Sequence, residues 1–113
     1  MHELSIARSL VAAAERHLPA ASRVSALRVA VGAATGIVPG ALDLAFRAAA
    51  GGTRLAGARR IIDRIAARSR CGACATEFSF HDVLGTCPAC GTPGGVLLAG
   101  DELALRSLEV FDV

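Results

Sequence analysis

All four cysteines of the chain fall in two C-x-x-C pairs, and this spacing is the clearest sign of chemistry in the sequence. Each pair can bend into a knuckle that presents two sulfurs to one ion, and four thiolates at about 2.3 Å complete the tetrahedral shell of a structural zinc. A single C-x-x-C pair can act as a redox dithiol, but a second pair favours a shared metal. We therefore predict a zinc site formed by Cys71, Cys74, Cys87 and Cys90.

The start of the chain offers a second group of metal ligands, Met1-His2-Glu3. The amine of Met1, the amide and imidazole of His2 and the amide of Glu3 can reach one plane, and a square-planar set of nitrogens suits Ni(II) or Cu(II). Amides at the start of a helix have no intrahelical acceptor, so a metal can take them without breaking a helical bond. The alternative for His2 is a solvated side chain. His17 fits the end of a helix, and His81 fits a loop residue or an adventitious metal contact.

Hydrophobic periodicity predicts the elements that position these groups. Residues 3–18 carry one apolar stripe at three- and four-residue steps, typical of an amphipathic helix that Pro19 ends. Residues 24–31 alternate apolar and polar side chains, which predicts a strand with one buried face. Pro39 suits the first turn of a second helix, which Gly51-Gly52 closes.

The remaining elements are less uniform in pattern. Residues 54–68 are ambiguous: their Ala and Arg content leans toward a helix, whereas the β-branched pair Ile61-Ile62 tolerates a strand. Residues 70–98 have no apolar period and form the metal module, which chelation should melt. Residues 102–111 alternate apolar and polar side chains as a strand does. This alternation shifts between Leu105 and Leu108, which predicts a bulge or bend.

Composition narrows the functional classes. The 113 residues allow one modest core, or a small core plus a metal module. A net charge of +2 and 4% aromatic residues give little support to nucleic-acid binding, and the arginine-rich run from residue 54 to 70 is interpreted as a solvated face. No set of side chains typical of an enzyme is present, so we predict no catalytic activity. No signal peptide and no bilayer-spanning segment are expected, and the C-x-x-C pairs suit reducing cytosol, so the expected location is cytoplasmic.

Taken in order along nearly the whole chain, these motifs resemble the HypA/HybF family of hydrogenase maturation factors, which are nickel metallochaperones. The resemblance rests on the start of the chain, on the end of the first strand and the glycine-proline turn after it, on both cysteine pairs, and on two closing motifs. These segments are Met1-His2-Glu3-Leu4-Ser5, Val29-Ala30-Val31-Gly32, Gly36-Ile37-Val38-Pro39-Gly40-Ala41-Leu42, Gly100-Asp101-Glu102-Leu103 and Ser107-Leu108-Glu109-Val110.

The resemblance implies an α+β fold: two helices on a small three-stranded sheet, with a four-cysteine zinc module inserted before the last strand. The nickel-binding body would comprise residues 1–69 and 99–113 and the zinc module residues 70–98, and residues 54–68 would be largely strand. His2 would bind Ni(II) with Met1 and Glu3, and the four cysteines would bind Zn(II). The family often has an acidic residue where this chain has Val38, and another where it has Ala33, so a carboxylate from that turn is absent here.

The resemblance further implies delivery of nickel to [NiFe] hydrogenase, and in some bacteria to urease. The expected partners are a nickel-handling GTPase and the precursor of the hydrogenase large subunit, with no nucleic acid and no membrane, and the chain is expected to be a monomer or a weak homodimer. The rival interpretation is a zinc-ribbon module that binds protein or nucleic acid. A third is a rubredoxin-like electron carrier with iron in the thiolate cage.

Overall fold

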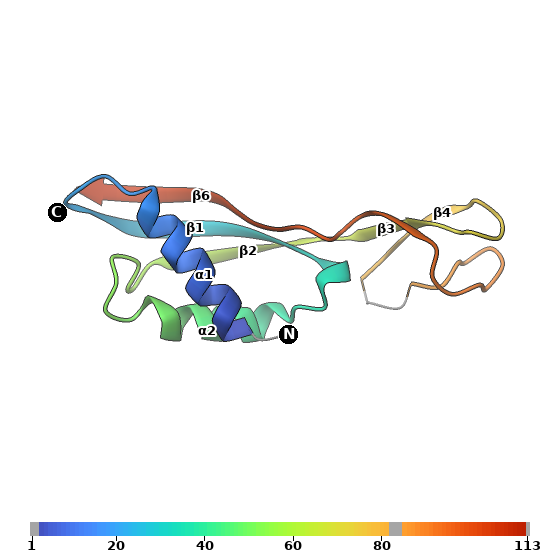
Figure 1. Cartoon of the computed structure of the whole chain (residues 1–113), viewed down its shortest axis with the longest axis horizontal. Coiled ribbons are helices and arrows are strands. Elements are labelled where there is room, and N and C mark those ends of the chain that lie inside the picture. Colours follow the sequence, from blue (N-terminus) through green and yellow to red (C-terminus); the bar gives the residue numbers. More distant parts are fainter. Residues whose placement is uncertain (1–2, 82–84, 113) are drawn as a thin grey trace.

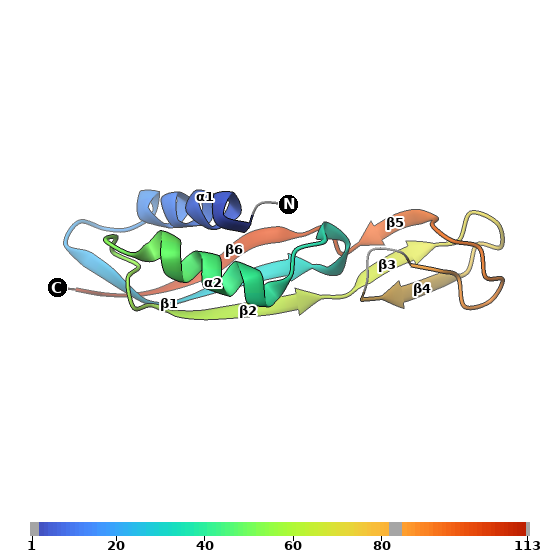
Figure 2. The same cartoon turned by 90° about the horizontal axis from the view of Figure 1, so that it is seen from below.

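The computed structural model of the protein describes residues 3–81 and 85–112. The chain forms two three-stranded sheets that follow one another along an elongated molecule of 57 × 21 × 18 Å (Figure 1). The first sheet has the strand order β2-β1-β6 and the second β4-β3-β5. Both helices cover the same face of the first sheet, as the side view shows (Figure 2). This arrangement confirms the predicted α+β fold.

The chain forms the helices and two strands of the first sheet, then all three strands of the second sheet, and returns to the first sheet with its last strand. The first part of the chain forms α1 (Glu3–Arg16), β1 (Ser22–Gly32), the short 3₁₀ helix η1 (Ala33–Thr35) and α2 (Pro39–Ala50). The rest forms β2 (Arg59–Ile65), β3 (Ala67–Arg70), β4 (Glu77–Phe80), β5 (Val96–Ala99) and β6 (Leu103–Asp112). Neither helix is long and apolar enough to cross a membrane in the part of the chain that is described.

The main core lies between the two helices and the first sheet. The apolar stripe of α1 buries its small residues Ala7, Val11 and Ala14, so the helix can pack closely. Leu42 and Phe46 of α2 are 0% and 1% exposed in the same cluster. The predicted helices and the predicted first strand are thus confirmed, with α1 ending two residues before the expected boundary.

The predicted bulge in the last strand is also confirmed. β1 pairs in parallel with β2 and antiparallel with β6, so it is the central strand of its sheet. Arg28 faces Ser107 and Val29 faces Leu105, which leaves Arg106 as the extra residue on β6. The shift brings both Leu105 and Leu108 to the core, and this explains their broken alternation in the sequence.

The helix that local propensity favoured for residues 54–68 is wrong. The strand implied by the family resemblance is correct for β2 and for the start of β3. Ile62 packs against the main core, and the β-branched isoleucines suit a strand beside β1. Two ion pairs support this position: Arg60 Nε lies 2.7 Å from Asp43 Oδ1 of α2, and Arg28 Nη1 lies 2.8 Å from Asp63 Oδ1. Tertiary packing therefore overrides the weak helix propensity of Ala and Arg.

A clasp of glycines joins the two sheets. The Gly32 amide donates to the Glu102 carbonyl at 2.7 Å, and the Ala34 amide donates to the Gly100 carbonyl at 2.8 Å. Gly100 has a φ of +103° and packs against Ala67, the first residue of β3. Backbone from both crossing points between the sheets is therefore in direct contact, and side chains at these glycines would keep it apart.

Candidate metal centre

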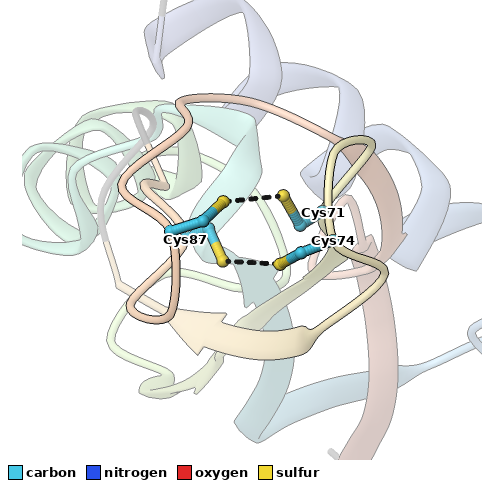
Figure 3. Close-up of side chains that lie close together, drawn as sticks. Cys71, Cys74 and Cys87 are labelled. Carbon is cyan, nitrogen blue, oxygen red and sulfur yellow. Dashed lines mark hydrogen bonds between the residues drawn. The ribbon is translucent and has the colours of Figure 1, made fainter.

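The four cysteines meet at the end of the second sheet that is farthest from the helices. Their four Sγ atoms all lie within 4.8 Å of one another. Two contacts of 3.6 Å cross between the knuckles, from Cys71 to Cys90 and from Cys74 to Cys87, and Figure 3 marks them as dashed lines. All four are free thiols. The structure therefore gathers all four predicted ligands into one cage.

The two knuckles repeat the same backbone pattern. In the first, the Cys71 amide donates to the Thr76 carbonyl at 2.9 Å, and the Ala75 amide donates to the Cys71 carbonyl at 2.9 Å. In the second, Cys87 takes the place of Cys71 and donates to the Thr92 carbonyl at 3.0 Å, while Gly91 donates back at 2.8 Å. The residue after each second cysteine is left-handed, with φ of +64° at Ala75 and +77° at Gly91.

Each pair has one buried and one exposed cysteine. Cys71 and Cys87 are 2% and 1% exposed and pack with Phe78 and Phe80 in a small second core. Cys74 and Cys90 are exposed. The second sheet thus holds its own cluster around the inner sulfurs, and the outer sulfurs close the cage from the solvent side.

Two threonines lower the pKa values of the exposed cysteines. The Thr76 hydroxyl oxygen lies 3.2 Å from the Cys74 sulfur, and hydrogen bonds from its hydroxyl and amide to the thiolate lower the pKa of Cys74 to about 6. Thr92 lowers the pKa of Cys90 in the same way, with its oxygen 3.3 Å from the sulfur. Burial has the opposite effect on Cys87, whose pKa is raised.

Neither threonine was identified as a site residue from the sequence. The signal was present, because the pattern C-x-x-C-x-T occurs twice, at 71–76 and 87–92. A repeat of this kind extends each knuckle by two residues and supplies a donor to the outer sulfur. Such outer donors orient and stabilise metal-bound thiolates.

The cage fits a tetrahedral ion bound through sulfur. Four sulfurs at about 2.3 Å from a central zinc would lie roughly 3.8 Å apart, close to the 3.6 Å contacts between the knuckles. The sulfurs would fill all four positions, as in a structural site rather than one that binds a substrate. The cysteines would stabilise the second sheet through a metal such as zinc.

Of the predicted nickel ligands, Met1 and His2 lie outside the described residues. Glu3 is the first residue of α1 and is partly buried in its first turn. The start of α1 belongs to the body, and Figures 1 and 2 place it well away from the cysteine loops.

The other two histidines occupy different places. His17 follows α1, and its Nδ1 lies 2.8 Å from the Ala13 carbonyl oxygen, in keeping with a residue at a helix end. His81 follows β4 and is exposed. Neither lies in the cysteine cage.

The arginine-rich run does not form one basic face. Arg54, Arg60 and Arg68 have acidic partners in Glu15, Asp43 and Glu77, respectively. This pairing removes half of the run from a surface that could bind phosphates, and it weakens the nucleic-acid interpretation.

Comparisons with known proteins agree with this arrangement. Residues 1–110 match the protein family described as "Hydrogenase/urease nickel incorporation, metallochaperone, hypA". A "Hydrogenase maturation factor HypA" of Geobacter sulfurreducens is 40% identical over 110 residues, covering 97% of this chain and 99% of that protein. A protein of the same name from Picosynechococcus is 39% identical over 115 residues, covering 98% of this chain and 100% of the relative.

Solved structures show the same fold. The solution structure of the Ni metallochaperone HypA from Helicobacter pylori superimposes with a TM-score of 0.67, at 24% identity and with full coverage of both chains. With a family match over nearly its whole length, relatives near 40% identity and a shared fold, the chain belongs to the HypA family of nickel-incorporation metallochaperones for hydrogenase maturation.

Proposed function

We propose that this chain binds one Ni(II) at its amino terminus and delivers it during the maturation of [NiFe] hydrogenase, and in a second role to urease. The ligands are the amine of Met1, the amide and imidazole of His2, and Glu3. The observations that carry this proposal are the family match over residues 1–110 and the place of Glu3, the first described residue, in the first turn of α1. Amides in the first turn of a helix have no intrahelical acceptors, so amides at this end of α1 can bind a metal without breaking a helical bond.

The charge at this end of α1 favours the same ligand set. The positive end of a helix dipole disfavours a bare cation, and the carboxylate of Glu3 in the first turn offsets that effect. Val38, which is 60% exposed just before α2, supplies no carboxylate, so the site depends on the first three residues.

The cysteine cage has a separate, structural role in this proposal. Residues 70–98 form a zinc module held by Cys71, Cys74, Cys87 and Cys90, and residues 1–69 and 99–113 form the nickel-binding body. All four positions of the cage are filled by sulfur, so its zinc is not transferred. Nickel, in contrast, is a cargo and must leave.

We further propose that the chain works in the cytoplasm with a nickel-handling GTPase and with the precursor of the hydrogenase large subunit, as a monomer or weak homodimer. It transfers a metal ion and catalyses no covalent reaction. The family description, which names nickel incorporation, supports this role.

The test is nickel titration of untagged, zinc-loaded protein, with both metals quantified. His2→Ala should abolish binding of nickel and leave the zinc content at one per chain. His17→Ala is the matched control, because it removes an exposed imidazole from the other end of α1. Equal nickel affinity in the His2→Ala protein and the parent would refute the assignment. Acetylation of the Met1 amine should also weaken nickel binding.

A further inference from the structure

A hollow of about 320 Å³ lies where the body meets the second sheet. Residues 31–33 and 36–39 form most of its described wall, and Arg64 of β2 and His81 after β4 complete it. The volume is at the lower end of the range of about 300–1,000 Å³ that holds small ligands. None of the cysteines lines the hollow, so it is distinct from the metal centre.

Among the described residues, only Arg64 and His81 contribute titratable side chains to the wall of this hollow, and no described carboxylate lines it. A guanidinium is charged at every physiological pH, so the hollow carries a permanent positive charge.

Arg64 has no salt bridge in the described parts of the chain, unlike the arginines that have carboxylate partners. Arg60, four residues earlier on the same strand, is paired with Asp43 at 2.7 Å. A cation that lines a concave surface without a counter-ion attracts an anion from solution. The paired arginines are Arg28, Arg54, Arg60 and Arg68.

The backbone of the hollow adds to the same field. α2 begins at Pro39 in its wall, and Val38 at the N-cap makes no side-chain hydrogen bond to the helix. The positive end of this 12-residue helix is therefore not neutralised by an acidic or hydroxyl cap.

We propose that this hollow binds an oxyanion, a phosphate or carboxylate group, with the Arg64 guanidinium as its main contact and His81 at its rim. A guanidinium offers two parallel donors to such a group, which gives both strength and orientation. This site is separate from the cysteine cage, and the proposal stands whether or not nickel binds at the amino terminus.

The experiment is a titration of zinc-loaded, nickel-free protein with inorganic phosphate, followed by amide NMR shifts at constant ionic strength against chloride. The shifts should saturate and concentrate in residues 31–41 and near Arg64. Arg64→Gln should weaken phosphate binding about tenfold or more, the loss of hydrogen bonds to a charged group. Arg47→Gln, the same change at an exposed arginine of α2 outside the hollow, should leave the affinity unchanged.

Arg64→Lys keeps the charge but loses the paired donors, so its affinity should fall between those of the parent and Arg64→Gln. A parallel titration with acetate separates the two sources: saturation by phosphate alone identifies a phosphate site, and saturation by both identifies a general oxyanion site. The proposal is overturned if phosphate produces no saturable shifts in the hollow, or if Arg47→Gln weakens binding as much as Arg64→Gln.

Discussion

The substitution Gly32→Ala tests the glycine clasp between the two sheets. Gly32 has φ −77° and ψ 142°, an extended conformation that alanine adopts freely, so the change causes no backbone strain of its own. Its new Cβ would, however, overlap the carbonyl group of Gly100 and lie 2.8 Å from the Glu102 amide nitrogen. These are backbone atoms and cannot rotate away, so the connector between β5 and β6 must move.

The expected cost follows from what that movement breaks. The two bonds of the clasp, Gly32 to Glu102 and Ala34 to Gly100, contribute about 1 kcal/mol each. Overpacking of a tight contact adds about 1–3 kcal/mol. We therefore expect the free energy of unfolding to fall by roughly 3–5 kcal/mol, measured by urea denaturation of the zinc-loaded protein with far-UV circular dichroism.

Gly40→Ala is the matched control, because Gly40 lies in α2 with open space where its Cβ would be. Alanine in a helix is more stable than glycine, so this variant should gain up to about 1 kcal/mol. If Gly32→Ala lost less than about 0.5 kcal/mol, within the usual range of a surface substitution, the close contact at the clasp would be refuted.

Four other outcomes are expected. Val38→Asp should stabilise the protein by about 1 kcal/mol in urea denaturation, because valine is a poor N-cap and aspartate a good one; an unchanged midpoint would contradict the N-cap geometry. Ala75→Gly should stabilise zinc-loaded protein against thermal unfolding by about 1 kcal/mol and Gly91→Ala destabilise it by a similar amount, since both positions have a left-handed φ; shifts of the same sign would rule this out. Thr76→Val should raise the pH at which zinc is released, measured with a zinc indicator: the loss of its hydroxyl raises the pKa of Cys74 from about 6, so protons displace the metal earlier as pH falls. Chelation should remove hydrogen-exchange protection from β3, β4 and β5 and leave that of β1, and equal protection with and without metal would show that the second sheet is stable alone.

Much of the body could be predicted because each element shows its buried face in the sequence. The stripe of α1, the alternation of β1 and the proline at the start of α2 are local signals, and the structure follows them. Even the bulge at Arg106 was visible as a slip between two leucines. The helix prediction for residues 54–68 failed because their strand is stabilised by pairing with β1 and by the ion pair with Asp43 of α2, and neither partner is near in sequence.

The strands of the second sheet could not be predicted from hydrophobic pattern in the same way. β3, β4 and β5 have four residues each, too few to show a period, and β5 exposes all three of its large apolar side chains. The four cysteines were predictable because metal ligands are defined by type and spacing rather than by burial. The supporting Thr76 and Thr92 become meaningful only once their hydroxyls are found beside the sulfurs.

The junction between the two sheets is where the body, the cysteine cage and the hollow are connected. The chain passes directly from β2 to β3 at Ala66, and from β5 to β6 at residues 100–102, so any change in the angle between the sheets must pass through these two short connections. The clasp of Gly32 and Gly100 holds them together, and the hollow that contains Arg64 has Gly32 in its wall. An anion bound at Arg64 would therefore contact the same backbone that fixes the orientation of the cysteine cage relative to the body. The hydrogen bonds of the clasp therefore connect the wall of the hollow to both sheets. The spacing of the cysteines in the sequence gives no indication of this connection.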